Sequence, residues 1–319
     1  GSVVWITVFW IVKALLKPAI LDSTATFVGI AIINTGFKVL NTALFLPLSG
    51  VLEKLVCKLI PDAKTAEKDI ELDERLLFTP TLALQQCSMK EIEMARSAAQ
   101  AFKNSITAIT SYTQELAESI REDERRCDHY EDMLATYLVK IGSERLADSD
   151  SEEANMLLKL LGDFERISDH AVNILESAEE MRDKKLAFST EAERDFSVIS
   201  AAVNEILELS MDAFINNDRD KASNVEPLEQ VIDDMKENMR TSHVLRMRNG
   251  ECSMEMGFVW SDILTNFERV SDHCSNIAGC VIDTAAHNLN LHETLGNFKR
   301  NDKNFETKYK MYAEKYSIE

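Results

Sequence analysis

The residues best suited to chemistry are carboxylates inside a repeated motif. The run DFERISDHAVNI, residues 163–174, returns as NFERVSDHCSNI, residues 266–277, with eight of twelve positions identical. Each copy carries a glutamate and an aspartate four positions apart: Glu165, Asp169, Glu268 and Asp272. Residues at this spacing lie on one face of a helix, about 5–6 Å apart at Cβ. Because carboxylates held so close repel each other, the repeated pairs predict a bound cation.

A second set of carboxylate pairs has the same spacing and precedes each motif: Glu124, Asp128, Glu229 and Asp233. The chain between each pair and its motif is long enough for one helix and its antiparallel return. We therefore expect four carboxylates to meet in each half of the chain, a donor set that suits magnesium, manganese, iron or zinc. The competing interpretation is a solvated acidic face, with Arg166 and Arg269 as counter-charges.

The histidines and asparagines of the motif have a different expected role. His170 and His273 directly follow the aspartates, so each points about 100° away from them around a helix. We expect packing or support of the ligands from these histidines, and support also from Asn173 and Asn276. No catalytic or organic-cofactor site is predicted.

The elements that must position these residues are helices. Apolar residues recur at three- and four-residue spacing from Pro80 onward, and alternating, strand-like runs are absent from the sequence there. We predict helices over residues 81–112, 114–141, 151–184, 191–216, 221–247, 252–288 and 301–317, with Ser151 and Thr190 as N-caps. The fold class is therefore all-α, with two repeated antiparallel three-helix bundles.

The first 60 residues differ in character from the remainder. They hold five lysines and two acids, a net charge of +3. Because the whole chain has a net charge of −19, the other residues together carry −22. From Ala25 to Leu48 the only charge is Lys38, and 24 residues suffice to cross a membrane. Residues 3–16 are apolar but shorter. One or two membrane helices are thus predicted, and Lys54 and Lys58 place everything after about residue 52 in the cytoplasm.

Charge and cysteine usage exclude other classes of protein. The acidic portion offers no basic patch for nucleic-acid phosphates. The six cysteines form no C-x-x-C pair, which argues against a zinc ribbon or a disulfide framework. Cys274 and Cys280 are expected to be packing residues.

Two segments resemble known families. ERISDHAVNI and ERVSDHCSNI, with their paired carboxylates and the two three-helix units, resemble the PhoU family of phosphate-signalling regulators. Upstream, IAIINTGFKVLNTALFLPL resembles the last membrane segment of bacterial sodium/phosphate cotransporters, and LDERLLFTPTLAL resembles the connector that follows it. That family often carries a PhoU-like domain after its membrane part.

The resemblance implies a domain plan and a function. Residues 1–60 would be the end of the membrane domain, 61–79 a linker or short surface helix, 80–288 a PhoU-like domain (repeats 80–187 and 188–288) and 289–319 a helical tail. The chain would be a fragment of a sodium-dependent phosphate transporter of the bacterial inner membrane. Its regulatory domain would carry iron or zinc clusters on the eight carboxylates.

The same resemblance limits what this chain could do alone. The Gln-Ser-Ser motifs that hold phosphate and sodium in that family are absent from the sequence, so the transport site would lie elsewhere in the transporter. The expected partners are therefore the rest of the membrane domain and the lipid bilayer, and a homodimer is left open.

Two other functions remain as alternatives. A helical adaptor would carry the same acidic pairs without metal. A ferritin-like di-iron enzyme would need Glu-x-x-His pairs on facing helices, whereas the histidines here follow aspartate directly. We therefore predict a regulator and not an enzyme.

Overall fold

The computed structural model describes most of the chain after residue 71. It covers residues 72–142, 146–286 and 304–317, without the side chains of 284–286, and five residues near the N-terminus: Asn34, Thr35, Lys38, Val39 and Thr42. The chain separates into two compact units, Gly1–Asp69 and Ile70–Glu319. In the first unit the five described residues are helical, and the Thr42 hydroxyl donates to the Lys38 carbonyl at 3.0 Å.

The second unit is built from helices alone among its described residues. A short 3₁₀ helix, η2, is followed by six long helices and one short one: η2 Glu74–Phe78, α4 Pro80–Thr110, α5 Gln114–Gly142, α6 Asp148–Lys184, α7 Thr190–Asn216, α8 Arg219–Arg248, α9 Met254–Ala286 and α11 Phe305–Lys315. The predicted all-α class and the helices after residue 80 are confirmed, with boundaries that differ by a few residues.

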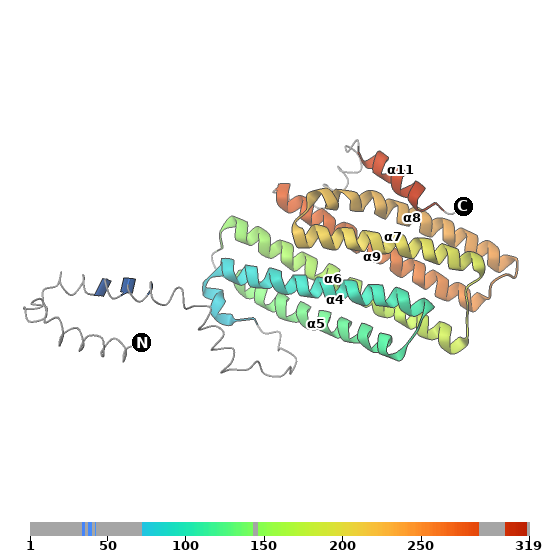
Figure 1. The fold of residues 1–319 in the computed structure, drawn as a ribbon, viewed down its shortest axis with the longest axis horizontal. Helices are drawn as coiled ribbons and strands as arrows, with labels where there is room; N and C mark the ends of the chain where they lie inside the picture. The colour runs from blue at the N-terminus through green and yellow to red at the C-terminus, as the bar shows by residue number, and fades with distance from the viewer. Residues whose placement is uncertain are drawn as a thin grey trace, which may run out of the picture. The chain divides into compact units, whose positions relative to one another are not determined.

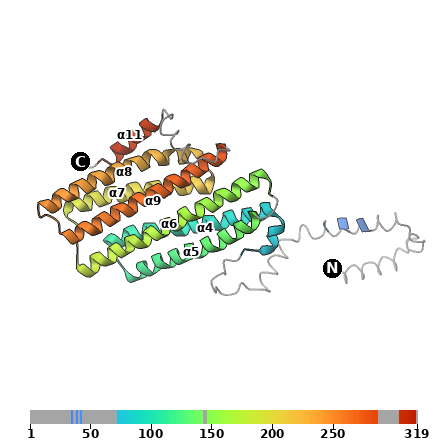
Figure 2. The ribbon, with the colours of Figure 1, turned by 180° about the vertical axis from the view of Figure 1, so that it is seen from behind.

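The six long helices form two antiparallel three-helix bundles, as predicted. Helices α4, α5 and α6 pack on one another, as do α7, α8 and α9, and the bundles meet chiefly along α6 and α9, with a smaller contact between α4 and α7 (Figure 1). Phe267 of α9 contacts rings from both bundles, with centroids 5.9 Å from Phe102 and 6.0 Å from Phe196. Seen from behind, α6 and α9 lie side by side (Figure 2), and each of these two helices carries one copy of the repeated motif.

Two predicted helix caps are wrong. Ser151 lies inside α6, which begins at Asp148 after Ala147 and has no side-chain cap. Asp148 and Asp150 occupy its first turn, where negative charge favours the positive end of the helix dipole. Helix α7 is capped by Ser189 and not Thr190, because the Ser189 hydroxyl accepts the Ala192 amide at 3.3 Å.

The predicted membrane segments, residues 3–16 and 25–48, lie outside the described residues except for the five named above. Among the helices that the structure does describe, none has both the length and the apolar character for crossing a bilayer. In the second unit, Cys274 and Cys280 are buried in the core, in agreement with a packing role.

Candidate metal centre

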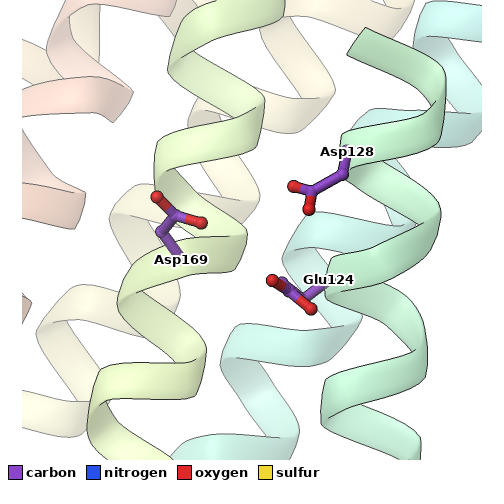
Figure 3. Close-up of side chains that lie close together, drawn as sticks. All are labelled: Glu124, Asp128 and Asp169. Atoms are coloured by element: carbon purple, nitrogen blue, oxygen red, sulfur yellow. The ribbon is translucent and has the colours of Figure 1, made fainter. Parts of the chain in front are cut away.

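Three predicted ligands of the first repeat come together between α5 and α6. Glu124 and Asp128 lie one turn apart on α5 and face Asp169 of α6 (Figure 3). One carboxylate oxygen from each residue lies within 4.8 Å of the other two. Glu124 and Asp169 are half-buried and Asp128 is exposed, so the group is open to solvent on one side.

The electrostatics of this group favour a bound positive charge. Partial burial raises the pKa of Glu124, and the charges of Asp128 and Asp169 raise it further. Burial also raises the pKa of Asp128, together with Asp169 and Asp132. A raised carboxyl pKa means that the ionised form is disfavoured where it stands. A cation placed among the three oxygens would relieve that repulsion.

The second repeat builds an equivalent group between α8 and α9. Oxygens of Glu229, Asp233 and Asp272 lie within 4.8 Å of one another. Glu229 is buried and the other two are half-buried. Burial raises the pKa of Asp272, and the neighbouring charges of Glu268 and Asp233 add to the effect. Six of the eight predicted ligands thus form two groups in corresponding places.

The remaining two predicted ligands, Glu165 and Glu268, are not part of these three-oxygen groups. Burial and the adjacent Asp169 raise the pKa of Glu165 to about 7. Glu268 instead pairs with Lys236 at 3.0 Å. The two repeats therefore differ at this position, and Glu268 already has a cationic partner from its own bundle.

Arginines accompany both groups, as the solvated-face interpretation requires. Arg166 lies 3.4 Å from Glu165 and 3.4 Å from Asp169. Arg269 lies 3.9 Å from Glu268 and 3.5 Å from Asp272. These guanidinium groups are more than half exposed, at 60% and 57%, and exposed ion pairs contribute about 0–1 kcal/mol. They offset only part of the repulsion among the carboxylates.

The motif histidines point to the contact between the repeats and not into the carboxylate groups. His170 Nδ1 lies 2.8 Å from Asn266 Oδ1, and His273 Nδ1 lies 2.8 Å from Asp163 Oδ1. The two imidazole rings lie 5.7 Å apart. This agrees with the predicted packing role.

Asp163 and Asn266 are the residues that the sequence reasoning missed. Asn276 donates to Asp163 Oδ1 at 3.2 Å, and Asn173 donates to Asn266 Oδ1 at 3.2 Å. The first residue of each motif copy is thus held by the histidine and asparagine of the other copy. The available clue was that Asp163 and Asn266 occupy the same place at the start of the motif. Because this position is Asp in one copy and Asn in the other, it was not among the identical positions.

The arrangement defines what each group could bind. Three carboxylates converging from two helices offer hard oxygen donors, which suit magnesium, manganese, iron or zinc and leave positions for water or further ligands. Glu124, Asp128 and Asp169 would hold an ion in the first repeat. The donor set contains no imidazole, which sets it apart from ferritin-like di-iron centres with their Glu-x-x-His pairs.

The fold is a pair of antiparallel three-helix bundles with an acidic group in each, and sequence comparison supplies the family. The PhoU domain family matches residues 92–178 and 196–281, one segment in each bundle and together more than half of the chain. The chain therefore belongs to the PhoU domain family.

Individual relatives agree with this assignment. The chain is 31% identical over 126 residues to "Phosphate-specific transport system accessory protein PhoU homolog 1" of Thermotoga maritima, covering 40% of this chain and 53% of that protein. The chain thus spans about half the length of that curated relative.

Two solved structures share the fold. They are PhoU from Pseudomonas aeruginosa, with a TM-score of 0.60 and 21% identity, and the phosphate transport system regulatory protein PhoU from Streptococcus pneumoniae, with 0.59 and 17%. Each alignment covers 66% of this chain and 99% of the other.

Proposed function

We propose that this chain regulates phosphate transport through a PhoU domain that binds metal ions at two sites. One observation carries the proposal: the same three-carboxylate group stands in corresponding places of the two family repeats, at Glu124, Asp128 and Asp169 and again at Glu229, Asp233 and Asp272. The named relatives are an accessory protein and a regulatory protein, which supports a regulator and not an enzyme.

The proposal extends to the setting of the domain. The sequence of residues 25–48 supports a membrane helix, so residues 1–60 would be the end of a sodium/phosphate cotransporter domain. Metal loading would then bias that transporter between conformations. Expressed in bacteria, the full chain should stay with membranes after a carbonate wash, and residues 70–319 should not. A full chain that washes off would contradict the membrane part of the proposal alone.

Metal content tests the sites directly. The full chain would be purified without chelator and its metal measured by elemental analysis, beside a double variant, Asp169→Asn with Asp272→Asn. These changes keep side-chain shape and remove one charge from each group. Matched controls come from the same two helices at exposed acids outside the groups: Glu176→Gln with Asp262→Asn. We expect metal in the native and control chains and most of it lost from the double variant.

The alternative of a metal-free adaptor has one observation in its favour. Arg166 and Arg269 contact both acids of their motif copy, and Lys236 pairs with Glu268, so counter-charges already exist. If the native chain stays empty after dialysis against iron, manganese, zinc and magnesium, the metal proposal is wrong and the adaptor stands. A di-iron enzyme is disfavoured because His170 and His273 are engaged between the repeats.

A further inference from the structure

Two histidines, one from each copy of the motif, meet where α6 packs on α9. The centroids of the His170 and His273 imidazole rings lie 5.7 Å apart, and both side chains are half-buried. The pair spans the main contact between the two bundles (Figure 2). Neither histidine belongs to the three-carboxylate groups. The two rings therefore form a second cluster of potential metal ligands, made of nitrogen and not of oxygen.

The hydrogen bonds made by Nδ1 determine the tautomer of both histidines. His273 Nδ1 lies 2.8 Å from Asp163 Oδ1, and a carboxylate oxygen accepts, so this nitrogen carries the proton. His170 Nδ1 lies 2.8 Å from Asn266 Oδ1. The Asn266 amide donates to the Asp262 carbonyl at 2.8 Å, which leaves its oxygen as the acceptor that faces His170. In the neutral form, each imidazole therefore has its lone pair on Nε2.

The positions of these acceptors turn the Nε2 sides of the two rings toward each other. Asn266 lies seven residues before His273 on α9, and Asp163 lies seven residues before His170 on α6, about 10 Å along each helix. Each Nδ1 is thus directed along the helix pair, away from the other histidine, and Nε2 lies on the other side of the ring. Neither Nε2 has a hydrogen-bond partner among the described residues, and neither is sealed from solvent.

We propose that His170 and His273 bind one transition-metal ion, such as zinc, nickel or copper, between their Nε2 atoms. Neutral imidazole is a common ligand of these metals. A metal about 2.1 Å from Nε2 lies about 3.2 Å from the ring centroid. Two rings on one ion then have centroids about 5.2 Å apart in a tetrahedral arrangement and at most about 6.4 Å apart. The separation of 5.7 Å falls within this range.

Asp163 and Asn266 would support the two ligands from behind. A metal-bound histidine commonly donates its other ring N–H to a carboxylate or a carbonyl oxygen, which fixes the orientation of the ring. His273 donates to the Asp163 carboxylate and His170 to the Asn266 amide oxygen. Water would fill the remaining coordination positions, and the ion would join α6 to α9. This inference does not depend on the proposed carboxylate centres.

Pulsed electron paramagnetic resonance with copper(II) tests the site, because the remote nitrogen of each bound imidazole modulates the signal and carboxylate oxygens do not. The full chain would carry His287→Gln and His292→Gln, which remove the two histidines outside the described residues. It would be titrated with up to three equivalents of copper, so that the carboxylate groups could also fill. We expect a species with two bound imidazoles. This readout distinguishes the histidine site from the carboxylate centres, whether or not those bind metal.

Variants locate the ligands. His170→Asn and His273→Asn keep an amide donor near the position of Nδ1 and remove Nε2. Each should leave one bound imidazole and weaken copper binding about tenfold or more, measured by competition with glycine, because a lost ligand costs at least as much as a lost supporting group. His129→Asn, at an exposed histidine of α5, is the matched control and should change neither property.

Asp163→Asn tests the support of the ligand with little risk to the fold, because the second copy of the motif already has asparagine at this position. It should weaken copper binding about tenfold while both imidazoles stay bound. The site is overturned if the starting chain shows no species with two imidazoles, or if that species survives His273→Asn.

Discussion

Replacing Glu91 by glutamine should stabilise the domain by an amount that grows with pH. The Glu91 side chain is 0% exposed, and neither of its oxygens has a hydrogen-bond partner among the described residues. Burial raises its pKa well above the ordinary carboxyl value because water no longer solvates the charged form. When α4 and α7 are aligned by their buried positions, Glu91 of the first repeat corresponds to Phe196 of the second. The equivalent position in the second bundle therefore holds an apolar side chain.

The magnitude follows from proton linkage. In the unfolded chain Glu91 ionises near its ordinary pKa of 4.5, whereas the folded protein keeps the proton to higher pH. Rising pH therefore favours the unfolded state, which loses a proton that the folded state retains. The cost is about 1.4 kcal/mol per pH unit above the ordinary value while the folded group stays protonated. Glutamine carries no such proton, so Glu91→Gln should gain about 1.2 kcal/mol over the native chain between pH 5 and pH 6, where the unfolded group is not yet fully ionised at the lower pH.

Urea unfolding followed by circular dichroism at pH 4.5, 5 and 6, in the presence of chelator, measures this difference. The pH dependence of the free energy of unfolding that comes from every other titrating group is the same in the native chain and in Glu91→Gln, so it cancels in the difference. An exposed match, Glu118→Gln, controls for the loss of a carboxyl and should give a difference independent of pH. If the Glu91→Gln difference is equally flat, the carboxyl is hydrated or paired in the folded protein, and the reasoning from burial is refuted.

Three further predictions concern the candidate site and the motif. Lys236→Glu should raise the metal content of the second repeat, because Glu268 loses its ammonium partner at 3.0 Å. Elemental analysis in an Asp169→Asn background, which weakens the first site, would measure this, and an unchanged metal content would argue that Glu268 is not a ligand. Asp163→Ala should destabilise the fold by about 2–4 kcal/mol, because His273 and Asn276 of the other repeat lose their buried acceptor. Urea unfolding measures this, and a change under about 1 kcal/mol would contradict it. Added manganese should raise the melting temperature more at pH 8 than at pH 5.5, because protons compete for carboxylates whose pKa values are raised; an equal shift at both values would count against binding there.

The sequence predicted the helical architecture well, because the apolar period is long and uninterrupted after Pro80. Helix ends were less predictable. Ser151 resembles a cap in sequence, but the preceding Asp148 and Asp150 already favour the start of α6, so the helix extends past it. At α7 both Ser189 and Thr190 are good caps, and only the backbone decides between them.

The site was predictable in its residue types and less so in its geometry. Helical spacing placed Glu165 and Asp169 on one face, yet only Asp169 has a carboxylate oxygen within 4.8 Å of those of Glu124 and Asp128. Spacing along one helix says nothing about how far each side chain lies from the next helix. The Lys236–Glu268 pair was also beyond sequence reasoning, because it joins two helices whose relative rotation is set by packing.

The two repeats share a scaffold but differ in charge where it matters for cations. Glu131 and Lys236 both lie seven positions after the first glutamate of their pairs, and Glu131 raises the pKa of Glu165 where Lys236 neutralises Glu268. The first repeat thus has the greater excess of negative charge around its carboxylates. If both centres bind metal, the first should therefore bind its ion more tightly and fill first, and the second would be the one whose occupancy varies with supply.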